Sequence, residues 1–388
     1  MKIKKPGAVV IEGHVQGLSN VRSLGEKGIP VIVIDKTNCI ARYSKYCKGF
    51  FKCPDFNSDE FTPFLIDLCK KENLQDWVLI PSNDHAVKNI SQNKTELEKY
   101  YKIITDDYSI ISKIYNKKEL LNLAEGVNVP IPKTYYPADS SLVDFYLSFP
   151  VIVKGIEGLT FYKTLGKKVF VTENKEELIG ALKKIEMKIP LNNVFIQEII
   201  RREENSYVCS FTSFSVNGEI KSFWIGEKVR EHPSEFGTAT FTRSIPVNET
   251  LELSKKLLSE LNYTGVCEIE FIKDSFDDTY KLIEINARTW LWVGLAKECG
   301  IDYAWYIYAY LNNIEINYPK DYKTNFAWSN FWVDIIFTTK DIIIDGKDFK
   351  ELSTIFENNT IQSVISKKDF KPFLMMTLLL PYIFIKRI

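Results

Sequence analysis

Residues 264–288 read TGVCEIEFIKDSFDDTYKLIEINAR, and this stretch decides how the chain is interpreted. Apolar and polar side chains alternate over 266–273 and again over 280–286, with the polar segment 274–279 between them. Alternation of this kind predicts two half-buried β-strands, and the short polar segment predicts the turn that joins them. We therefore expect a β-hairpin whose turn lies near Asp277.

The predicted hairpin gathers carboxylates on one face. Strand side chains alternate between faces, so Glu268 and Glu270 share one face of the first strand, and Glu284 and Asn286 share one face of the second. Glu270 is expected opposite Glu284, where like charges repel unless a cation lies between them. Glu270, Glu284 and Asn286 supply three oxygen ligands, a set typical of magnesium, and Arg288 follows within reach of a phosphoryl group on that metal. The alternative is a solvated hairpin with ordinary surface carboxylates.

Composition restricts the chemistry. The 388 residues correspond to roughly two or three domains. Fifty basic side chains balance fifty acidic ones, which argues against a protein that holds nucleic acid by bulk charge. Three histidines leave little room for a histidine zinc site, so an enzyme of this composition is expected to use carboxylates, lysines and arginines. Seven cysteines without a C-x-x-C motif are typical of reduced thiols in a cytoplasm.

The first hundred residues alternate strand and helix signals. Strands are predicted at 8–11, 30–35 and 77–80, and helices at 18–27 and 61–72. This order predicts a parallel sheet, in which ligands bind beyond the carboxyl ends of the strands. Those ends carry the polar segments 13–17 and 82–84. Because no G-x-G-x-x-G motif follows the first strand, a dinucleotide site is disfavoured.

A second domain is expected to begin near residue 110. A helix is predicted over 110–125, and two prolines at 130 and 132 mark a boundary before strand and hairpin signals take over. An apolar strand then delivers Lys154 at its end, followed by a hairpin loop over 155–168 that contains glycines and lysines. This loop is interpreted either as a phosphate clamp or as an ordinary solvated loop. Further strands are predicted at 169–171 and 194–200.

Together, the hairpin, the Lys154 strand and the 194–200 strand resemble the ATP-grasp superfamily over roughly residues 1–315. The most specific element is the pair of motifs EIEF and LIEINAR in the hairpin, which resembles the paired metal-ligand signature of that family. The resemblance implies an α/β fold, α+β in its nucleotide-binding part. The implied parts are a Rossmann-like domain at 1–110, a leading helix and smaller lobe at 111–200, a larger lobe with the metal site at 201–315, and a C-terminal extension at 316–388.

The resemblance also implies roles for individual residues. ATP phosphates are expected on Lys117 and Lys154, and the transferred phosphoryl group on Arg288. Two magnesium ions, or manganese in their place, are expected on Glu270, Glu284 and Asn286. The adenine-reading hinge and the ribose-binding carboxylate are assigned to Gln197, Glu198, Ile200 and Glu204. The sequence departs from the family in the 155–168 loop, which holds Leu159, Phe161 and Tyr162 where glycine and serine are usual, and at Ala287, where proline is common.

The reaction that the resemblance implies is activation of a carboxylate by ATP to an acyl phosphate, which an amine converts to an amide. The subgroup it looks most like is the carboxylate–amine ligases that include D-aspartate ligase-like enzymes. Arg230 is expected to pair bidentately with the substrate carboxylate or the acyl phosphate, with a surface arginine as the alternative. Two other functions remain open on this fold: a catalytically silent ATP-binding regulatory protein, and a carboxylase-type enzyme.

The C-terminal end is unusual. Residues 373–385 are nearly all apolar, and Lys367, Lys368 and Lys371 precede them. This segment is too short to span a bilayer, and it is interpreted either as a peripheral membrane contact or as a last helix docked on the protein and broken at Pro381. We expect a cytoplasmic protein, with the inner face of the membrane as the alternative place. The expected partners are a small-molecule or envelope-precursor carboxylate, an amine such as an amino acid, and a second copy in a homodimer, but no nucleic acid.

Overall fold

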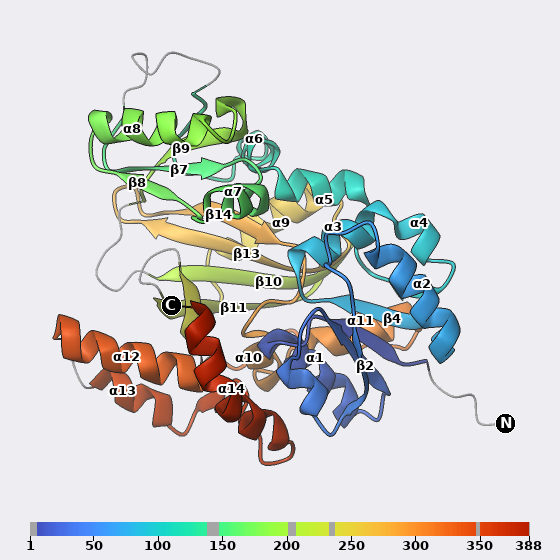
Figure 1. The fold of residues 1–388 in the computed structure, drawn as a ribbon. Coiled ribbons are helices and arrows are strands. Elements are labelled where there is room, and N and C mark those ends of the chain that lie inside the picture. Colours follow the sequence, from blue (N-terminus) through green and yellow to red (C-terminus); the bar gives the residue numbers. More distant parts are fainter. Residues whose placement is uncertain (1–5, 138–146, 201–206, 233–236, 347–349, 388) are drawn as a thin grey trace.

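The computed structural model describes residues 6–137, 147–200, 207–232, 237–346 and 350–387. Within these ranges three β-sheets are formed, one with five strands, one with four and one with seven, and helices cover them. Figure 1 shows the small four-stranded sheet at the top, the long seven-stranded sheet across the centre, and the N-terminal sheet at the lower right. The predicted α/β class is confirmed.

The N-terminal sheet is parallel, with strand order β3-β2-β1-β4-β5. Its central strands are short runs of valine and isoleucine and are buried, as expected of strands that helices cover on both faces. Its elements are β1 (Ala8–Ile11), α1 (Val15–Glu26), β2 (Val31–Asp35), the 3-10 helix η1 (Ile40–Tyr43), β3 (Cys47–Lys52), α2 (Phe61–Glu72), β4 (Trp77–Pro81), α3 (Asp84–Gln92), α4 (Lys94–Leu97) and β5 (Tyr101–Ile103).

The connection from β1 to α1 is tighter than predicted. The helix begins at Val15, three residues before the expected start at residue 18. Glu12 takes a left-handed backbone conformation, with φ of 71°, and turns the chain directly into the helix. A Cβ atom at Gly17 would lie 2.1 Å from the Glu12 carbonyl oxygen, so glycine permits this close approach.

The predicted single helix over 110–125 is wrong, because two helices occupy this stretch. They are α5 (Tyr108–Tyr115) and α6 (Lys117–Gly126), and Asn116 lies between them. The Asn116 side chain accepts hydrogen bonds from the backbone N–H groups of Lys118 and Glu119, which satisfies two of the free donors at the start of α6. The break places Lys117 at the first position of α6.

The smaller lobe is built on the antiparallel sheet β6-β9-β7-β8. Its elements are β6 (Thr134–Tyr135), β7 (Val151–Gly155), α7 (Gly158–Leu165), β8 (Phe170–Thr172), α8 (Lys175–Glu186), the 3-10 helix η3 (Leu191–Asn193) and β9 (Val194–Glu198). The predicted hairpin loop over 155–168 is wrong, because most of this stretch is the helix α7. Phe161 explains the difference, since its side chain is 1% exposed and packs edge-on against Phe170, with ring centroids 6.1 Å apart.

The larger lobe holds the seven-stranded sheet, in the order β14-β13-β10-β11-β12-β15-β16. Its own elements are β10 (Val208–Val216), β11 (Glu219–His232), β12 (Thr238–Ser244), α9 (Thr250–Leu261), β13 (Gly265–Asp274), β14 (Thr279–Asn286), α10 (Val293–Glu298) and α11 (Tyr303–Leu311). Strands β13 and β14 form the predicted hairpin. Their register pairs Glu268 with Asn286 and Glu270 with Glu284, as expected.

The C-terminal extension is part of the large sheet. Strand β15 (Ala327–Ser329) pairs with β12, and β16 (Thr360–Gln362) pairs with β15. Its other elements are α12 (Phe331–Asp345), α13 (Lys350–Ser353), the 3-10 helix η4 (Thr354–Phe356) and α14 (Lys371–Arg387). The predicted break at Pro381 is wrong, since α14 continues to Arg387; proline removes a single backbone donor, and a helix can continue past it. No helix in the described ranges has the length and apolar character needed to cross a membrane.

Two buried aspartates fasten this extension to the rest of the protein. Asp369 accepts hydrogen bonds from Arg22 Nε at 2.9 Å and from Ser44 Oγ at 2.7 Å, both in the N-terminal domain. Asp334 on α12 accepts from Arg230 on β11 through both carboxylate oxygens. The extension therefore contacts both the first domain and the larger lobe.

Candidate active site

Three carboxylates of the hairpin surround one amide group. Asn286 Nδ2 donates to Glu268 Oε2 at 3.2 Å, to Glu270 Oε1 at 3.4 Å and to Glu284 Oε1 at 3.2 Å. Glu268 and Glu270 are 3% and 8% exposed, respectively. The face predicted from strand alternation is therefore formed, and its acidic groups lie close together on β13 and β14.

Lysines from other elements balance this charge. Lys117 Nζ, at the start of α6, lies 3.3 Å from Glu284 Oε2. Lys228 Nζ, on β11, lies 2.6 Å from Glu270 Oε1, and its side chain is 11% exposed. Burial lowers the pKa of Lys154 to about 8, helped by the positive charge of Lys117 and opposed by Glu284 and Glu270. Lys117 and Lys154, the two lysines expected on ATP phosphates, thus lie near the hairpin carboxylates, whereas Lys228 was not assigned a role from the sequence.

The carboxylates differ in their preferred protonation state. Burial raises the pKa of Glu268, and the neighbouring Glu270 carboxylate raises it further. Burial alone would also raise the pKa of Glu284, but Lys117 and Lys228 outweigh it and lower that pKa. The hairpin therefore holds one carboxyl group that favours its proton beside one that favours its charge.

The donor set fits a hard divalent cation. Over the described ranges no three histidine, cysteine, aspartate or glutamate side chains form a complete metal site by themselves. Glu268 Oε1 is buried without a hydrogen-bond partner. The Asn286 N–H group lies among three carboxylates, and the negative charge of these carboxylates would also attract a cation to that place. Two glutamates with an amide oxygen leave coordination positions for phosphate oxygens and water, which is how magnesium is usually bound.

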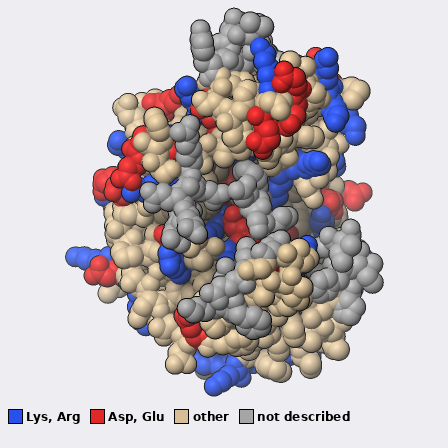
Figure 2. Space-filling model, turned by 90° about the vertical axis from the view of Figure 1, so that its left-hand side faces the viewer, with Lys and Arg blue, Asp and Glu red and all other residues tan. Residues whose placement is uncertain are grey.

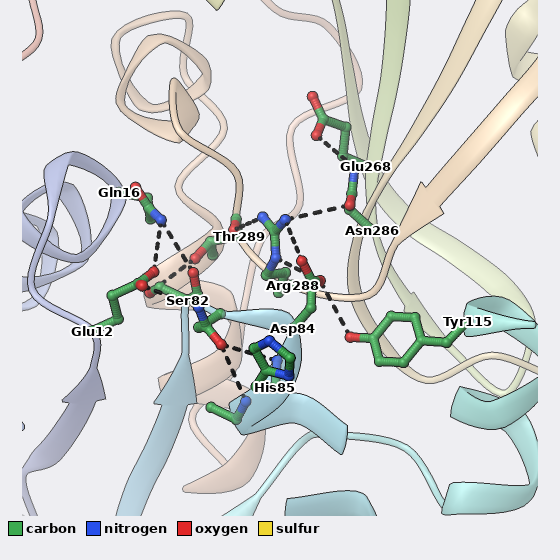
Figure 3. Close-up of polar contacts among 12 residues, drawn as sticks. Glu12, Gln16, Ser82, Asp84, His85, Tyr115, Glu268, Asn286, Arg288 and Thr289 are labelled. Atoms are coloured by element: carbon green, nitrogen blue, oxygen red, sulfur yellow. Dashed lines mark hydrogen bonds and ion pairs between the residues drawn. The ribbon is translucent and has the colours of Figure 1, made fainter. Parts of the chain in front are cut away.

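Arg288 joins the hairpin to the first domain. Its Nε donates to Asp84 Oδ1 at 2.7 Å and its Nη2 to Asp84 Oδ2 at 2.8 Å, and the two side chains are 17% and 22% exposed. Nη2 also lies 3.3 Å from Asn286 Oδ1. Figure 3 shows Arg288 between Asp84, at the start of α3, and Asn286 of the hairpin, with Tyr115 also reaching Asp84. Asp84 is the first residue of α3, directly beyond strand β4.

The carboxyl ends of β1 and β4 form the other wall of this junction. The Glu12 carboxylate accepts hydrogen bonds from Gln16 Nε2 and Asn83 Nδ2, and burial raises its pKa. Asn20 Nδ2 donates to Thr289 Oγ1 at 3.0 Å, next to Arg288. These are the strand ends at which ligands of parallel sheets usually bind, and Figure 3 shows Glu12 and Gln16 facing the Ser82 and Thr289 side.

The predicted nucleotide-binding strand lies in the smaller lobe. Gln197 is 5% exposed and its Nε2 donates to Thr134 Oγ1 at 3.0 Å. Glu198 Oε1 accepts from Tyr135 Oη at 3.2 Å, and Ile200 follows the end of β9 and is 9% exposed. Glu204 lies outside the described residues. Viewed from its left-hand side, the molecule is hollowed between this lobe and the body, and basic and acidic side chains lie around the hollow (Figure 2).

Arg230 has a partner within the chain. Its Nε and Nη2 donate to Asp334 at 3.0 and 2.7 Å, its Nη1 donates to Thr354 Oγ1 at 3.1 Å, and its guanidinium lies 4.2 Å from the Phe241 ring centroid. The sequence analysis expected Arg230 to pair bidentately with the substrate carboxylate or the acyl phosphate, and in the structure its bidentate partner is the carboxylate of Asp334. The structure does not bring Arg230 together with the hairpin carboxylates.

Lys228 and Asp84 are the site residues that sequence reasoning missed. The polar segment 82–84 was expected at a ligand-binding edge, but its contact with Arg288 spans 204 residues. Lys228 reaches Glu270 because β10 lies between β11 and β13, an order that no local pattern encodes. In the sequence, Asp84 was visible only as a charged residue after a strand end and Lys228 only as a charged residue on a strand. Nothing in the sequence indicated which residue each would contact.

Comparison with known proteins agrees with this geometry. The family model for the ATP-binding domain of the carbamoyl-phosphate synthase L chain matches residues 224–305. The D-aspartate ligase of Enterococcus faecium (strain Aus0004) is 26% identical over 262 residues, which cover 64% of this chain and 62% of that protein. The chain therefore spans less than two thirds of the length of this curated relative.

Two solved structures illustrate the shared fold. The L-amino acid ligase from Bacillus licheniformis has a TM-score of 0.61 and 15% identity, covering 79% of this chain and 74% of that one. The N5-carboxyaminoimidazole synthetase from Staphylococcus aureus has a TM-score of 0.64 and 16% identity, covering 90% of this chain and 88% of that one. At these identities the likeness establishes the fold, and it extends over most of both chains.

Proposed function

We propose that the chain is a member of the ATP-grasp superfamily and acts as an ATP-dependent carboxylate–amine ligase. Such an enzyme activates a carboxylate as an acyl phosphate, joins it to an amine as an amide, and releases ADP and phosphate. The observation that carries the proposal is the convergence of Lys117, Lys154 and Lys228 with three carboxylates and Arg288 at one junction.

Nucleotide binding is proposed across the two lobes. Lys117 and Lys154 would contact ATP phosphates, since both lie near the hairpin carboxylates and carry the positive charge that polyphosphate requires. Backbone groups of Gln197, Glu198 and Ile200 are proposed to read adenine, and Glu204 to bind ribose. Glu270, Glu284 and Asn286 would hold one or two magnesium ions, or manganese. The bound metal would neutralise the negative charge that develops on the phosphates.

The chemical steps need positioned charge and no protein nucleophile. A substrate carboxylate oxygen attacks the γ-phosphorus of ATP, the bond to the β,γ-bridging oxygen breaks, and ADP leaves. A neutral amine then attacks the acyl carbon, phosphate leaves, and the amine gives up a proton. Arg288 presents two parallel N–H donors that suit a phosphoryl or carboxylate group, and Lys228 supplies a second positive charge beside Glu270.

The amine is proposed to enter from the first domain. Asp84 and Glu12 lie at the strand ends beside Arg288, where ligands of parallel sheets usually bind and where their carboxyl oxygens would accept hydrogen bonds from an amine. Arg230 is proposed as a positioning residue, because its pair with Asp334 holds β11, the strand that carries Lys228. The acid is proposed to be a small molecule or a cell-envelope precursor, and the amine an amino acid. A cytoplasmic homodimer is the form that we propose for the protein.

The test is substrate-dependent release of ADP from MgATP across a panel of amino acids and sugar acids. Activity is expected to require one acid and one amine together, and Glu284→Gln is expected to abolish it without unfolding the protein. Glu219→Gln is the matched control, since Glu219 is exposed on β11 and pairs only locally with Lys221. Activity that survives Glu284→Gln contradicts the metal assignment. Bicarbonate-dependent release without an amine favours a carboxylase, and nucleotide binding without turnover favours a regulatory protein.

A further inference from the structure

Helix α14 has two apolar faces, and one of them packs on the protein. The Phe373 ring stacks on Trp332 with centroids 6.0 Å apart and an interplanar angle of 1°. Met376 is 7% exposed, and Thr377 Oγ1 accepts a hydrogen bond from Trp332 Nε1 at 3.1 Å. This inner face fixes the first half of the helix against α12.

The opposite face is apolar and open. Phe370, just before the helix, and Leu374 and Leu378 within it are 52%, 51% and 65% exposed. Their spacing of four residues places them on one side of the helix. Phe356 is also 64% exposed, and its ring centroid lies 6.3 Å from that of Phe331, which in turn packs on Phe373. We call Phe356, Phe370, Leu374 and Leu378 the outer apolar face.

Exposed apolar side chains are concentrated in this part of the molecule. Thirteen large apolar residues are exposed in the described ranges, and six of them lie in the extension, which is less than a fifth of the chain. The six are Ile343, Ile344 and the four residues of the outer apolar face. Isolated exposed apolar residues are normal, but a cluster of them marks a surface that binds something.

The charge beside this face is positive. Lys367, Lys368 and Lys371 are exposed next to Phe370, and within the described part of the chain no carboxylate forms an ion pair with them. The one acidic residue between them, Asp369, points inward and is 3% exposed, because it binds Arg22. The lysines therefore face outward without an acidic neighbour to neutralise them.

We propose that the outer apolar face docks on an anionic lipid surface. Apolar side chains on one side of a helix enter the boundary of the acyl chains, and lysines beside them meet negative headgroups. A second copy of the chain fits less well, since a two-fold contact through this face would bring the three lysines of one copy against those of the other.

The surface is formed before binding. Asp369 joins the start of α14 to Arg22, Ser44 and the backbone N–H of Lys45, so the helix is held in place by the N-terminal domain. A surface whose backbone is already ordered loses less conformational entropy on docking, which favours binding by a small number of side chains. Figure 1 shows α14 beside α12 and α13, next to the N-terminal domain.

The test is cosedimentation of the full chain with vesicles. Vesicles of equimolar phosphatidylcholine and phosphatidylglycerol are compared with vesicles of phosphatidylcholine alone. The wild type is expected in the pellet with the anionic vesicles only, and less of it at about 1 M salt, where charges are screened beyond roughly 3 Å. Leu374→Ser with Leu378→Ser, and separately Lys367→Glu with Lys368→Glu, are each expected to weaken binding by about tenfold or more.

Matched controls change similar residues elsewhere. Met187→Ser with Phe276→Ser removes two exposed apolar side chains, and Lys183→Glu with Lys184→Glu reverses two exposed lysines on α8; both are expected to bind like the wild type. Equal thermal midpoints establish that the variants are folded. The proposal is overturned if the wild type stays in the supernatant, or if the face variants bind as well as the controls. It is also overturned if the wild type is a dimer that the Leu374 and Leu378 changes convert to a monomer, because the face is then a contact between copies.

Discussion

Asp84→Asn should increase the affinity of the site for anions. In the structure Asp84 occupies the two parallel N–H groups of Arg288, at 2.7 and 2.8 Å, which are the donors that a phosphoryl group needs. A phosphate must therefore displace Asp84 before Arg288 can bind it. Charge-assisted hydrogen bonds contribute roughly 1.5–3 kcal/mol, against about 1 kcal/mol for neutral ones. Removing the charge should thus relieve about 2 kcal/mol of competition, which corresponds to a roughly 30-fold tighter Kd.

The assay is calorimetric titration of inorganic phosphate into the protein saturated with MgADP. Asp55→Asn is the control, because it breaks an exposed pair with Lys36 in the same domain and is expected to leave phosphate affinity unchanged. A phosphate Kd that stays the same or rises in Asp84→Asn refutes the reasoning, since it means that Asp84 orients Arg288 and does not compete for it. Failure of the wild type to bind MgADP would instead contradict nucleotide binding itself.

Three further predictions concern charge. The pKa of Lys154 is about 8 in the free protein, and bound phosphate should raise this pKa because it favours the charged ammonium. The affinity for MgATP should therefore be full below about pH 8 and fall above it. Calorimetry in two buffers checks this, because binding near pH 8 should take up a proton. Asp334→Ala leaves the Arg230 charge buried without its carboxylate and should lower the free energy of unfolding in urea by about 3–5 kcal/mol. The double variant Arg230→Met with Asp334→Leu should recover most of that free energy. A change near zero in Asp334→Ala contradicts the assignment. The raised pKa of Glu268 means that cation binding releases a proton, so Mg²⁺ affinity should rise with pH in the wild type, and Glu268→Gln should flatten that dependence in a Mg²⁺ titration.

Local patterns predicted the fold well where the chain folds locally. Helix 61–72 and the hairpin register between Glu270 and Glu284 agree with the structure, because turn residues and period-two alternation act over a few neighbours. The break at Asn116 was missed, since an asparagine inside a helical pattern is also compatible with a continuous helix. Helix α7 was missed because Phe161 is drawn into the core of the smaller lobe by residues distant in the sequence.

The site was predictable in its chemistry and less so in its partners. The acidic face follows from strand alternation and Lys154 from a strand end, whereas Lys117 was implied only by the family resemblance; the structure brings these residues close together. Whether they bind ATP and magnesium remains a prediction. The pairs of Arg288 with Asp84 and of Arg230 with Asp334 span 204 and 104 residues, so only tertiary structure determines which carboxylate each arginine meets. The same holds for Lys228, whose neighbour Glu270 is set by the order of strands in the sheet.

The pairing of β15 with β12 has a practical consequence for anyone who shortens this protein. A chain cut after residue 315, at the boundary suggested by the resemblance, would leave the backbone N–H and C=O groups of β12 without their neighbouring strand. An open edge of this kind is a template for pairing with other molecules, so the shortened protein should aggregate. The same cut would remove Asp334, the carboxylate that pairs with Arg230. The larger lobe and residues 316–362 therefore share one sheet, and deletions aimed at the outer apolar face should begin after β16.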